Sequence, residues 1–144
     1  MTTEFFGMLG AAICMGIAAI GSAIGIGIAG QGAIGAWKRC YVNNKPAPFI
    51  LTVFAGAPLT QTIYGYLLMN SLNDRIVSDK PAAALGLGIG CGLAMCFSAI
   101  AQGKCGAAGA DALGETEKGF SQYITVVGLC ETVALFSMVF GMIA

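Results

Sequence analysis

The sequence predicts an all-α membrane protein with four transmembrane helices. Of its 144 residues, 57% are hydrophobic and 10% are charged, and the mean hydropathy is +0.82. The charged residues fall almost entirely into three short clusters, which separate four apolar stretches at 5–37, 49–73, 82–103 and 119–144. Each stretch is long enough to cross about 30 Å of hydrocarbon at about 1.5 Å per helical residue.

The links between the stretches are short, so we expect no extramembrane catalytic domain. No basic residue precedes the first stretch, which we therefore interpret as a retained helix rather than a signal peptide. The first and third links, which should share one face, carry more Lys and Arg than the second, which predicts that both termini lie outside the cytoplasm. The residues counted are Lys38, Arg39, Lys45, Lys104 and Lys118 on one face, and Arg75 and Lys80 on the other.

Glycine is concentrated in the first and third stretches, whereas the second and fourth hold most of the aromatic residues. Small residues four positions apart allow helices to approach closely. We therefore expect the first and third helices to form a narrow inner layer, enclosed by the second and fourth. The predicted glycine pairs are Gly21 with Gly25, Gly86 with Gly90, and Gly88 with Gly92.

The chain is an internal duplication. A shift of 71 residues pairs Gly21 with Gly92 and Gln31 with Gln102, among other positions. This repeat predicts two tandem helical hairpins, 1–73 and 74–144. Because both hairpins should run in the same direction, they are parallel repeats about an axis along the membrane normal, and copies placed side by side can close a ring.

Two apparent binding signals carry no function in our interpretation. Residues 25–30 fit the GxGxxG pattern of nucleotide-binding turns, but no strand precedes them. The six cysteines contain no CxxC pair and the chain has no histidine, so we interpret the cysteines as packing residues. We expect no organic cofactor and no nucleic-acid partner.

Glu131 is the only charged residue after Lys118, and it lies midway along the fourth stretch. A carboxylate inside a membrane costs several kcal/mol and typically marks an ion pathway. At a shift of 70 or 71 its counterpart in the first half is Gln61 or Thr60. The duplication therefore predicts one ionisable site per four helices.

The residues around that counterpart supply neutral oxygens. Thr60, Gln61 and Tyr64 can face one neighbour, Pro58 frees a nearby backbone carbonyl, and Gln102 is a further amide in the third stretch. With Glu131, they form an oxygen set suited to Na⁺, whose binding would neutralise the carboxylate. Two alternatives stay open: the glutamines only bridge helices, or the site carries H⁺. Tyr64 is expected to donate to Glu131 unless it only packs.

The combination of these features resembles the proteolipid, known as K or c, of V-type rotary ATPases. The resemblance covers essentially the whole chain. It rests on the duplicated glycine-rich hairpin, the Pro58-x-Thr60-Gln61-x-x-Tyr64 sequence, Gln102-Gly103 in the third helix and the lone Glu131 in the fourth.

The resemblance implies a membrane rotor. About ten copies would form a homo-oligomeric ring in lipid, coupled by a central stalk to an ATPase head and turned against a stator subunit that carries an arginine. The chain itself would carry the ion and hydrolyse nothing. In the sodium-transporting bacterial members, the ligands match Thr60, Gln61, Gln102, Glu131 and the backbone carbonyl of Ala57, and Tyr64 holds the carboxylate.

Two details depart from a simple match. Leu59 stands where a glycine often follows the proline, which adds bulk near the predicted site. Counted from the outer ends of the stretches, Gln102 lies deeper than Gln61 and Glu131. Level ligands therefore require the third helix to begin further out.

Two other classes of protein are considered. A small four-helix multidrug transporter also carries one membrane glutamate, but in its first helix, without this duplication. A structural pore-forming proteolipid would assemble from glycine-rich hairpins and make no use of Glu131. Co-purification with soluble ATPase subunits separates both from the rotor.

Overall fold

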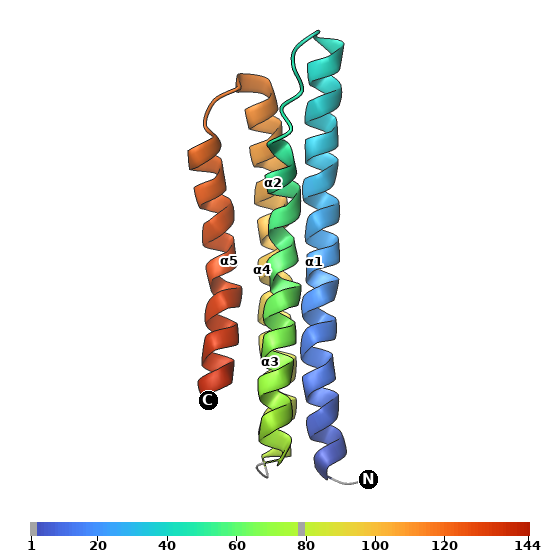
Figure 1. The fold of residues 1–144 in the computed structure, drawn as a ribbon, viewed down its shortest axis with the longest axis vertical. Coiled ribbons are helices and arrows are strands. Elements are labelled where there is room, and N and C mark those ends of the chain that lie inside the picture. Colours follow the sequence, from blue (N-terminus) through green and yellow to red (C-terminus); the bar gives the residue numbers. More distant parts are fainter. Residues whose placement is uncertain (1–2, 78–79) are drawn as a thin grey trace.

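A computed structural model describes residues 3–77 and 80–144, with 75–77 described in backbone only. Every regular element among these residues is a helix, as the sequence predicts, and Figure 1 shows the helices as a long upright bundle. The elements are α1 (Thr3–Val42), α2 (Leu51–Gly56), the 3₁₀ turn η1 (Ala57–Leu59), α3 (Thr60–Val77), α4 (Pro81–Thr116) and α5 (Phe120–Ile143).

The predicted membrane character is clear in three of the described helices, α1, α4 and α5, which are long and apolar enough to cross a bilayer. The second predicted span differs, because it is divided at Pro58 into α2, η1 and α3. Proline lacks the N–H of a helical ladder and crowds the preceding turn, so the chain tightens there into a 3₁₀ turn. The three pieces nevertheless follow one another in line (Figure 1).

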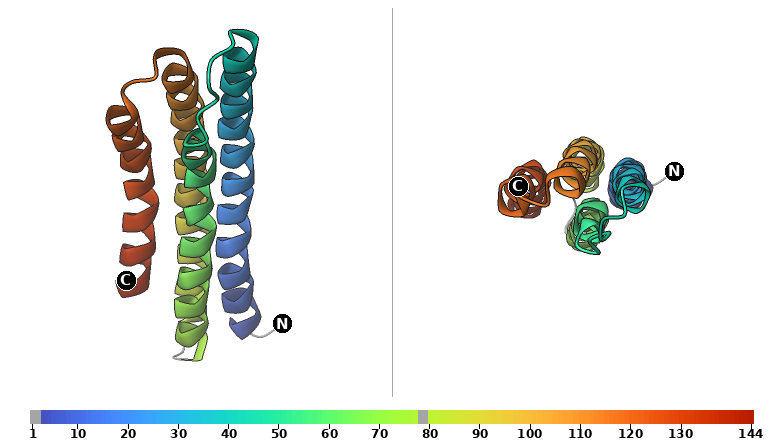
Figure 2. Two further views of the ribbon diagram at one scale, coloured as in Figure 1. Left: turned by 45° about the horizontal axis from the view of Figure 1, so that its top comes forward. Right: turned by 90° about the horizontal axis from the view of Figure 1, so that it is seen from above.

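The two halves of the chain run in the same direction. In Figure 1, α1 and α4 both rise from the end that holds the N-terminus, and α2–α3 and α5 both return toward it. Seen from above in Figure 2, α4 lies between α1 and α5, and the second segment packs against both α1 and α4. This arrangement fits two parallel hairpins. Their division between residues 73 and 74 stays a prediction, and α3 itself continues to Val77.

Glycines bring α1 and α4 together along their length. A methyl group added at Gly21 would overlap the backbone of Cys96, and one at Gly103 the backbone of Gly25. Gly88 and Gly92 likewise face the backbone of α1. Gly86 and Gly90 take no part in this contact within the chain. A Cβ atom added at either would meet no atom of another helix within 4 Å, because residues two positions from Gly88 lie about 200° around the helix.

Helices α1 and α4 continue past their predicted spans. At the loop end, Arg39 of α1 forms ion pairs with Asp111 and Glu115 of α4, and Lys45 pairs with Glu117 at 3.5 Å. Lys104 therefore lies inside α4 and not in a link, contrary to the prediction. Lys38 and Arg39 likewise lie inside α1, and Arg75 inside α3, so the basic residues that remain in the links are Lys45 and Lys118 on one face and Lys80 on the other.

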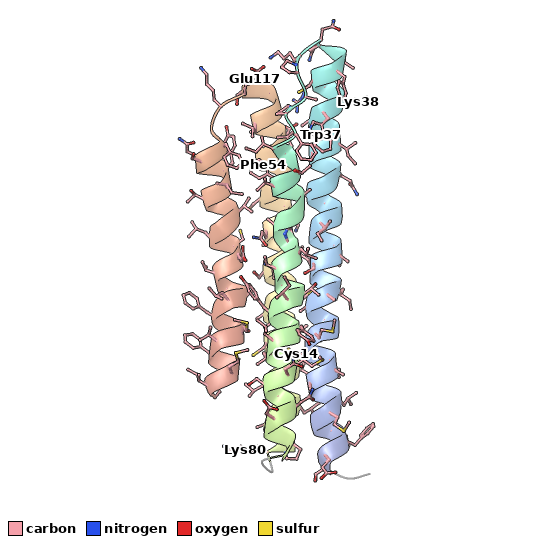
Figure 3. The ribbon with its side chains drawn as sticks, viewed as in Figure 1. Cys14, Trp37, Lys38, Phe54, Lys80 and Glu117 are labelled. Carbon is pink, nitrogen blue, oxygen red and sulfur yellow. The ribbon has the colours of Figure 1, made fainter. Side chains whose placement is uncertain are left out.

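Two apolar clusters fill the bundle, one toward each end. Figure 3 labels Cys14 in the first cluster and Phe54 in the second. Along α1 the first cluster ends at Ala18 and the second begins at Ala33. The layer between them holds the buried polar side chains Ser22, Gln61, Ser98 and Gln102.

Candidate functional site

Glu131 lies in this middle layer, where α3, α4 and α5 meet. Its Oε1 accepts a hydrogen bond of 2.7 Å from the hydroxyl of Tyr64, and its Oε2 accepts one of 3.1 Å from Nε2 of Gln102. Glu131 is only partly buried, so part of its side chain is accessible at the surface of the chain. Both oxygens are thus held by neutral donors from two different helices.

The two predicted glutamines touch each other. Gln61 Nε2 donates to Gln102 Oε1 at 2.7 Å, and neither side chain has any solvent exposure. Gln102 Nε2 also donates to the Val127 carbonyl at 3.2 Å. An amide chain therefore runs from α3 through α4 to α5, in which each buried amide has partners, as buried polar groups require.

The 3₁₀ turn at Pro58 supplies a third set of oxygens. Thr60 Oγ1 lies 3.2 Å from the Ala57 carbonyl oxygen and 3.3 Å from Gln61 Oε1. The Ala57 carbonyl ends this turn by accepting the backbone N–H of Thr60, which places the Thr60 hydroxyl beside the same oxygen. All six residues of the predicted set, Ala57, Thr60, Gln61, Tyr64, Gln102 and Glu131, therefore belong to one network.

The length of α4 explains why Gln102 lies deeper than Glu131 when residues are counted from the outer ends of the stretches. Gln102 and Glu131 are at one level, since they are hydrogen-bonded. The helix that carries Gln102 begins at Pro81, and Figure 1 shows α5 ending short of that end of the bundle. Leu59 does not crowd the site, because its side chain is 52% exposed and turned outward.

The sequence interpretation missed two contacts that support the site. Ser98 Oγ donates to the Cys130 carbonyl at 2.6 Å, beside Glu131, and the Val127 carbonyl accepts from Gln102. Ser98 had a signal in the sequence, since it precedes Gln102 by one helical turn and shares its face. The Val127 carbonyl had none, because every residue carries such a group.

The chemistry of this site is that of a single negative charge among neutral dipoles. Glu131 is its one carboxylate, and the amides, hydroxyls and carbonyls around it add no formal charge. Such a site is neutralised by one monovalent cation or one proton. Fold and site together define a small membrane-embedded proteolipid with an intramembrane carboxylate.

Comparison with known proteins finds related membrane subunits of rotary ATPases. The family model for the C subunit of ATP synthase matches residues 85–144. An A-type ATP synthase subunit K of Methanocaldococcus jannaschii is 33% identical over 138 residues, which are 95% of this chain and 60% of that relative. The 16 kDa proteolipid of the V-type proton ATPase of Homo sapiens is 29% identical over 141 residues, 97% of this chain and 90% of the relative.

These matches support a proteolipid of the V-type and A-type rotary ATPases. It spans only 60% of the length of the archaeal relative.

Proposed function

We propose that this chain is the rotor-ring subunit of a V-type ATPase and carries Na⁺ on Glu131, one ion per four helices. It acts as a subunit and not as an enzyme on its own. About ten copies form a closed ring, with α1 and α4 toward the axis and the hairpins 1–73 and 74–144 as its repeats. Both termini lie outside the cytoplasm, and the loop end faces a central stalk and ATPase head.

The hydrogen-bonded network around Glu131 carries this proposal. Oxygens that share one cation at about 2.4 Å in octahedral geometry lie about 3.4 Å from one another. The separations of Thr60 Oγ1 from the Ala57 carbonyl and from Gln61 Oε1, 3.2 and 3.3 Å, are close to that value. Gln102 and Glu131 complete the set within hydrogen-bond reach.

The electrostatic consequence is a site that can move through lipid. An isolated carboxylate is expensive to bury in hydrocarbon, whereas a carboxylate paired with Na⁺ has no net charge. The neutral ligands stabilise the ion without adding a charge that would need its own partner. Tyr64 keeps Glu131 oriented toward them through its 2.7 Å hydrogen bond.

Release requires a competing cation at one point of the rotation. We propose that an arginine of the stator subunit pairs with Glu131 there, so that Na⁺ leaves to one half-channel and the site reloads from another. Moving one elementary charge across the membrane is worth about 2.3 kcal/mol per 100 mV, so the number of copies sets the ion-to-ATP ratio.

Proton transport is the second candidate, because the human relative is named as part of a proton ATPase. A proton needs only the carboxylate. In that case the glutamines would bridge helices and hold Glu131 through hydrogen bonds.

The two candidates differ in how Na⁺ affects the reaction of Glu131 with a hydrophobic carbodiimide, which attacks the protonated acid. In the unmutated assembly, millimolar Na⁺ should slow labelling at neutral and alkaline pH, and protection should weaken as pH falls. Labelling that is indifferent to Na⁺ across this range would instead identify a proton site.

Assembly is tested separately. In mild detergent the chain should run as a closed oligomer and co-purify with soluble ATPase subunits. A multidrug transporter or a purely structural pore-forming proteolipid would be recovered without them.

A further inference from the structure

Ser22 carries a buried hydroxyl that the network above does not use. Its side chain in α1 is 2% exposed, and its Oγ has no hydrogen-bond partner, a condition it shares only with Arg39 Nε among the buried side-chain atoms of the described residues. A buried hydroxyl without a partner is costly, and each one in a native fold requires an explanation.

Packing places Ser22 at the level of Gln61. A Cβ atom added at Gly65 would lie 2.7 Å from Cβ of Ala18, and one at Gly25 would lie 2.8 Å from Cβ of Pro58. The two segments are antiparallel, so Ser22, between Ala18 and Gly25 on α1, falls opposite Gln61, between Gly65 and Pro58. Ala18, Ser22 and Gly25 also share one face at helical spacing.

The position of Ser22 between the two apolar clusters agrees with this register. Along α1, the buried residues of the first cluster end at Ala18 and those of the second begin at Ala33, so the segment between them crosses the polar layer. In that layer Gln61 is fully buried and belongs to the neighbouring segment, which α1 contacts. The unpartnered hydroxyl therefore belongs to the same layer as the ion site.

The hydroxyl of Ser22 can serve the side-chain amide of Gln61 as a second hydrogen-bond acceptor. Its Nε2 donates to Gln102 Oε1 at 2.7 Å, which occupies an oxygen that a bound cation would need. When both amide oxygens turn to a cation, the N–H groups of Gln61 must point elsewhere and find another acceptor. A serine hydroxyl with no existing bond is suited to that role.

We propose that Ser22 is a positioning residue of the ion site, which accepts an N–H of Gln61 when the site is loaded and so presents the Gln61 carbonyl oxygen to the cation. The inference rests on the proposed Na⁺ function. It assigns to α1, which supplies none of the other site residues, a part in ion selectivity. Ser22 itself does not bind the ion.

The test compares Ser22→Ala with the unmutated assembly, using the Na⁺ concentration that halves carbodiimide labelling of Glu131. Loss of one hydrogen bond of this kind should raise that concentration about three- to tenfold. Thermal stability without Na⁺ should be unchanged or higher, since an unpartnered hydroxyl has been removed. The stabilisation gained on adding Na⁺ should be smaller.

Two further variants separate positioning from packing. Ser22→Thr keeps the hydroxyl and should restore Na⁺ protection toward the unmutated value. Ala18→Gly, one turn away on the same face, removes a buried methyl group and should lower thermal stability with no change in Na⁺ dependence.

The outcomes are distinct. If the unmutated assembly shows no Na⁺ protection, the Na⁺ function is wrong and this inference is wrong with it. If the unmutated assembly is protected and Ser22→Ala is protected equally, the Na⁺ function stands and the role of Ser22 is refuted. A Ser22→Ala variant that loses stability equally with and without Na⁺ would also refute it, because the hydroxyl would then be structural only.

Discussion

Gln61 and Gln102, 41 positions apart in sequence, join the two halves of the chain by a hydrogen bond of 2.7 Å between Nε2 and Oε1. Both side chains are fully buried, so the bond is shielded from water and from lipid. Gln102 Nε2 in turn donates a hydrogen bond of 3.1 Å to Glu131 Oε2. The carboxylate of the second half is therefore held by an amide chain that begins in the first half, and neither half contains a complete site.

Replacement of Glu131 by Gln should abolish ion-coupled ATPase activity and leave the assembly intact. The amide has nearly the same volume as the carboxylate, but it cannot alternate between charged and neutralised states. Reconstituted ion transport and detergent-solubilised oligomer size are the two measurements. Ion transport that survives this change would exclude Glu131 as the carrier.

Gln102→Leu should weaken Na⁺ protection of Glu131 by about ten- to a hundredfold, because it removes an oxygen ligand and a donor to a charged group. Gln61→Leu should act in the same direction, and both variants should still react with carbodiimide at low pH. Gln31→Leu is the matched control, since Gln31 is the counterpart of Gln102 in the duplication but is exposed. Equal effects from all three would point to a general loss of folding.

Tyr64→Phe removes only the hydroxyl that donates to Glu131. We expect Na⁺ protection to weaken by about tenfold or more, as for other hydrogen bonds to charged groups. Tyr66→Phe provides the comparison, because Tyr66 lies two residues away and is 50% exposed. The proposed orienting role of Tyr64 does not hold if the two variants behave alike.

Gly25→Ala should destabilise the folded chain by about 1–3 kcal/mol, the usual range for overpacking. The new methyl group would lie 2.8 Å from Cβ of Pro58 and against the backbone of Ala99. A Cβ atom added at Gly90 meets no other part of the chain within 4 Å, so Gly90→Ala should leave thermal stability unchanged or raise it slightly through the higher helix propensity of alanine. A shift in oligomer size without a loss of stability in the second variant would place Gly90 between copies.

Cys105 and Cys130 should form an intrachain disulfide under a mild oxidant such as diamide. Their sulfur atoms lie 3.6 Å apart, and closing to about 2 Å needs only a small adjustment of α4 and α5. Both thiols are oxidised, and diamide takes up the two electrons and two protons. Peptide mapping under non-reducing conditions identifies the pair, and Cys105→Ser is the control. Linkage of Cys130 to another cysteine would mean that the two helices are in a different register.

Much of the candidate site could be predicted because its members are rare residue types in their surroundings. A carboxylate, two glutamines and a threonine stand out in an apolar background, whatever their neighbours are. Ser22 did not stand out in this way, since serine is small and common in membrane helices. Only its burial and its unpartnered oxygen distinguish it.

Contacts between helices were harder to predict, because they depend on rotation and axial offset. Gly88 and Gly90 are alike in sequence, but one faces the backbone of Gly10 and the other faces open space. The position of Lys104 shows that the length of a helix along its axis is equally hard to predict. Its charge predicted a link, whereas α4 continues to Thr116 because its far end packs against α1 outside the apolar layer.

The sequence by itself determined the class of fold and singled out the polar residues that the structure joins in one hydrogen-bonded network, because hydropathy sums over a segment and a lone intramembrane charge needs no neighbour to be noticed. The tertiary structure decided where the second segment breaks, which glycines meet α1, and how Gln102 reaches the level of Glu131. Those features depend on distances between residues far apart in the chain and on the turn that Pro58 imposes. Neither the hydropathy pattern nor the composition encodes these distances.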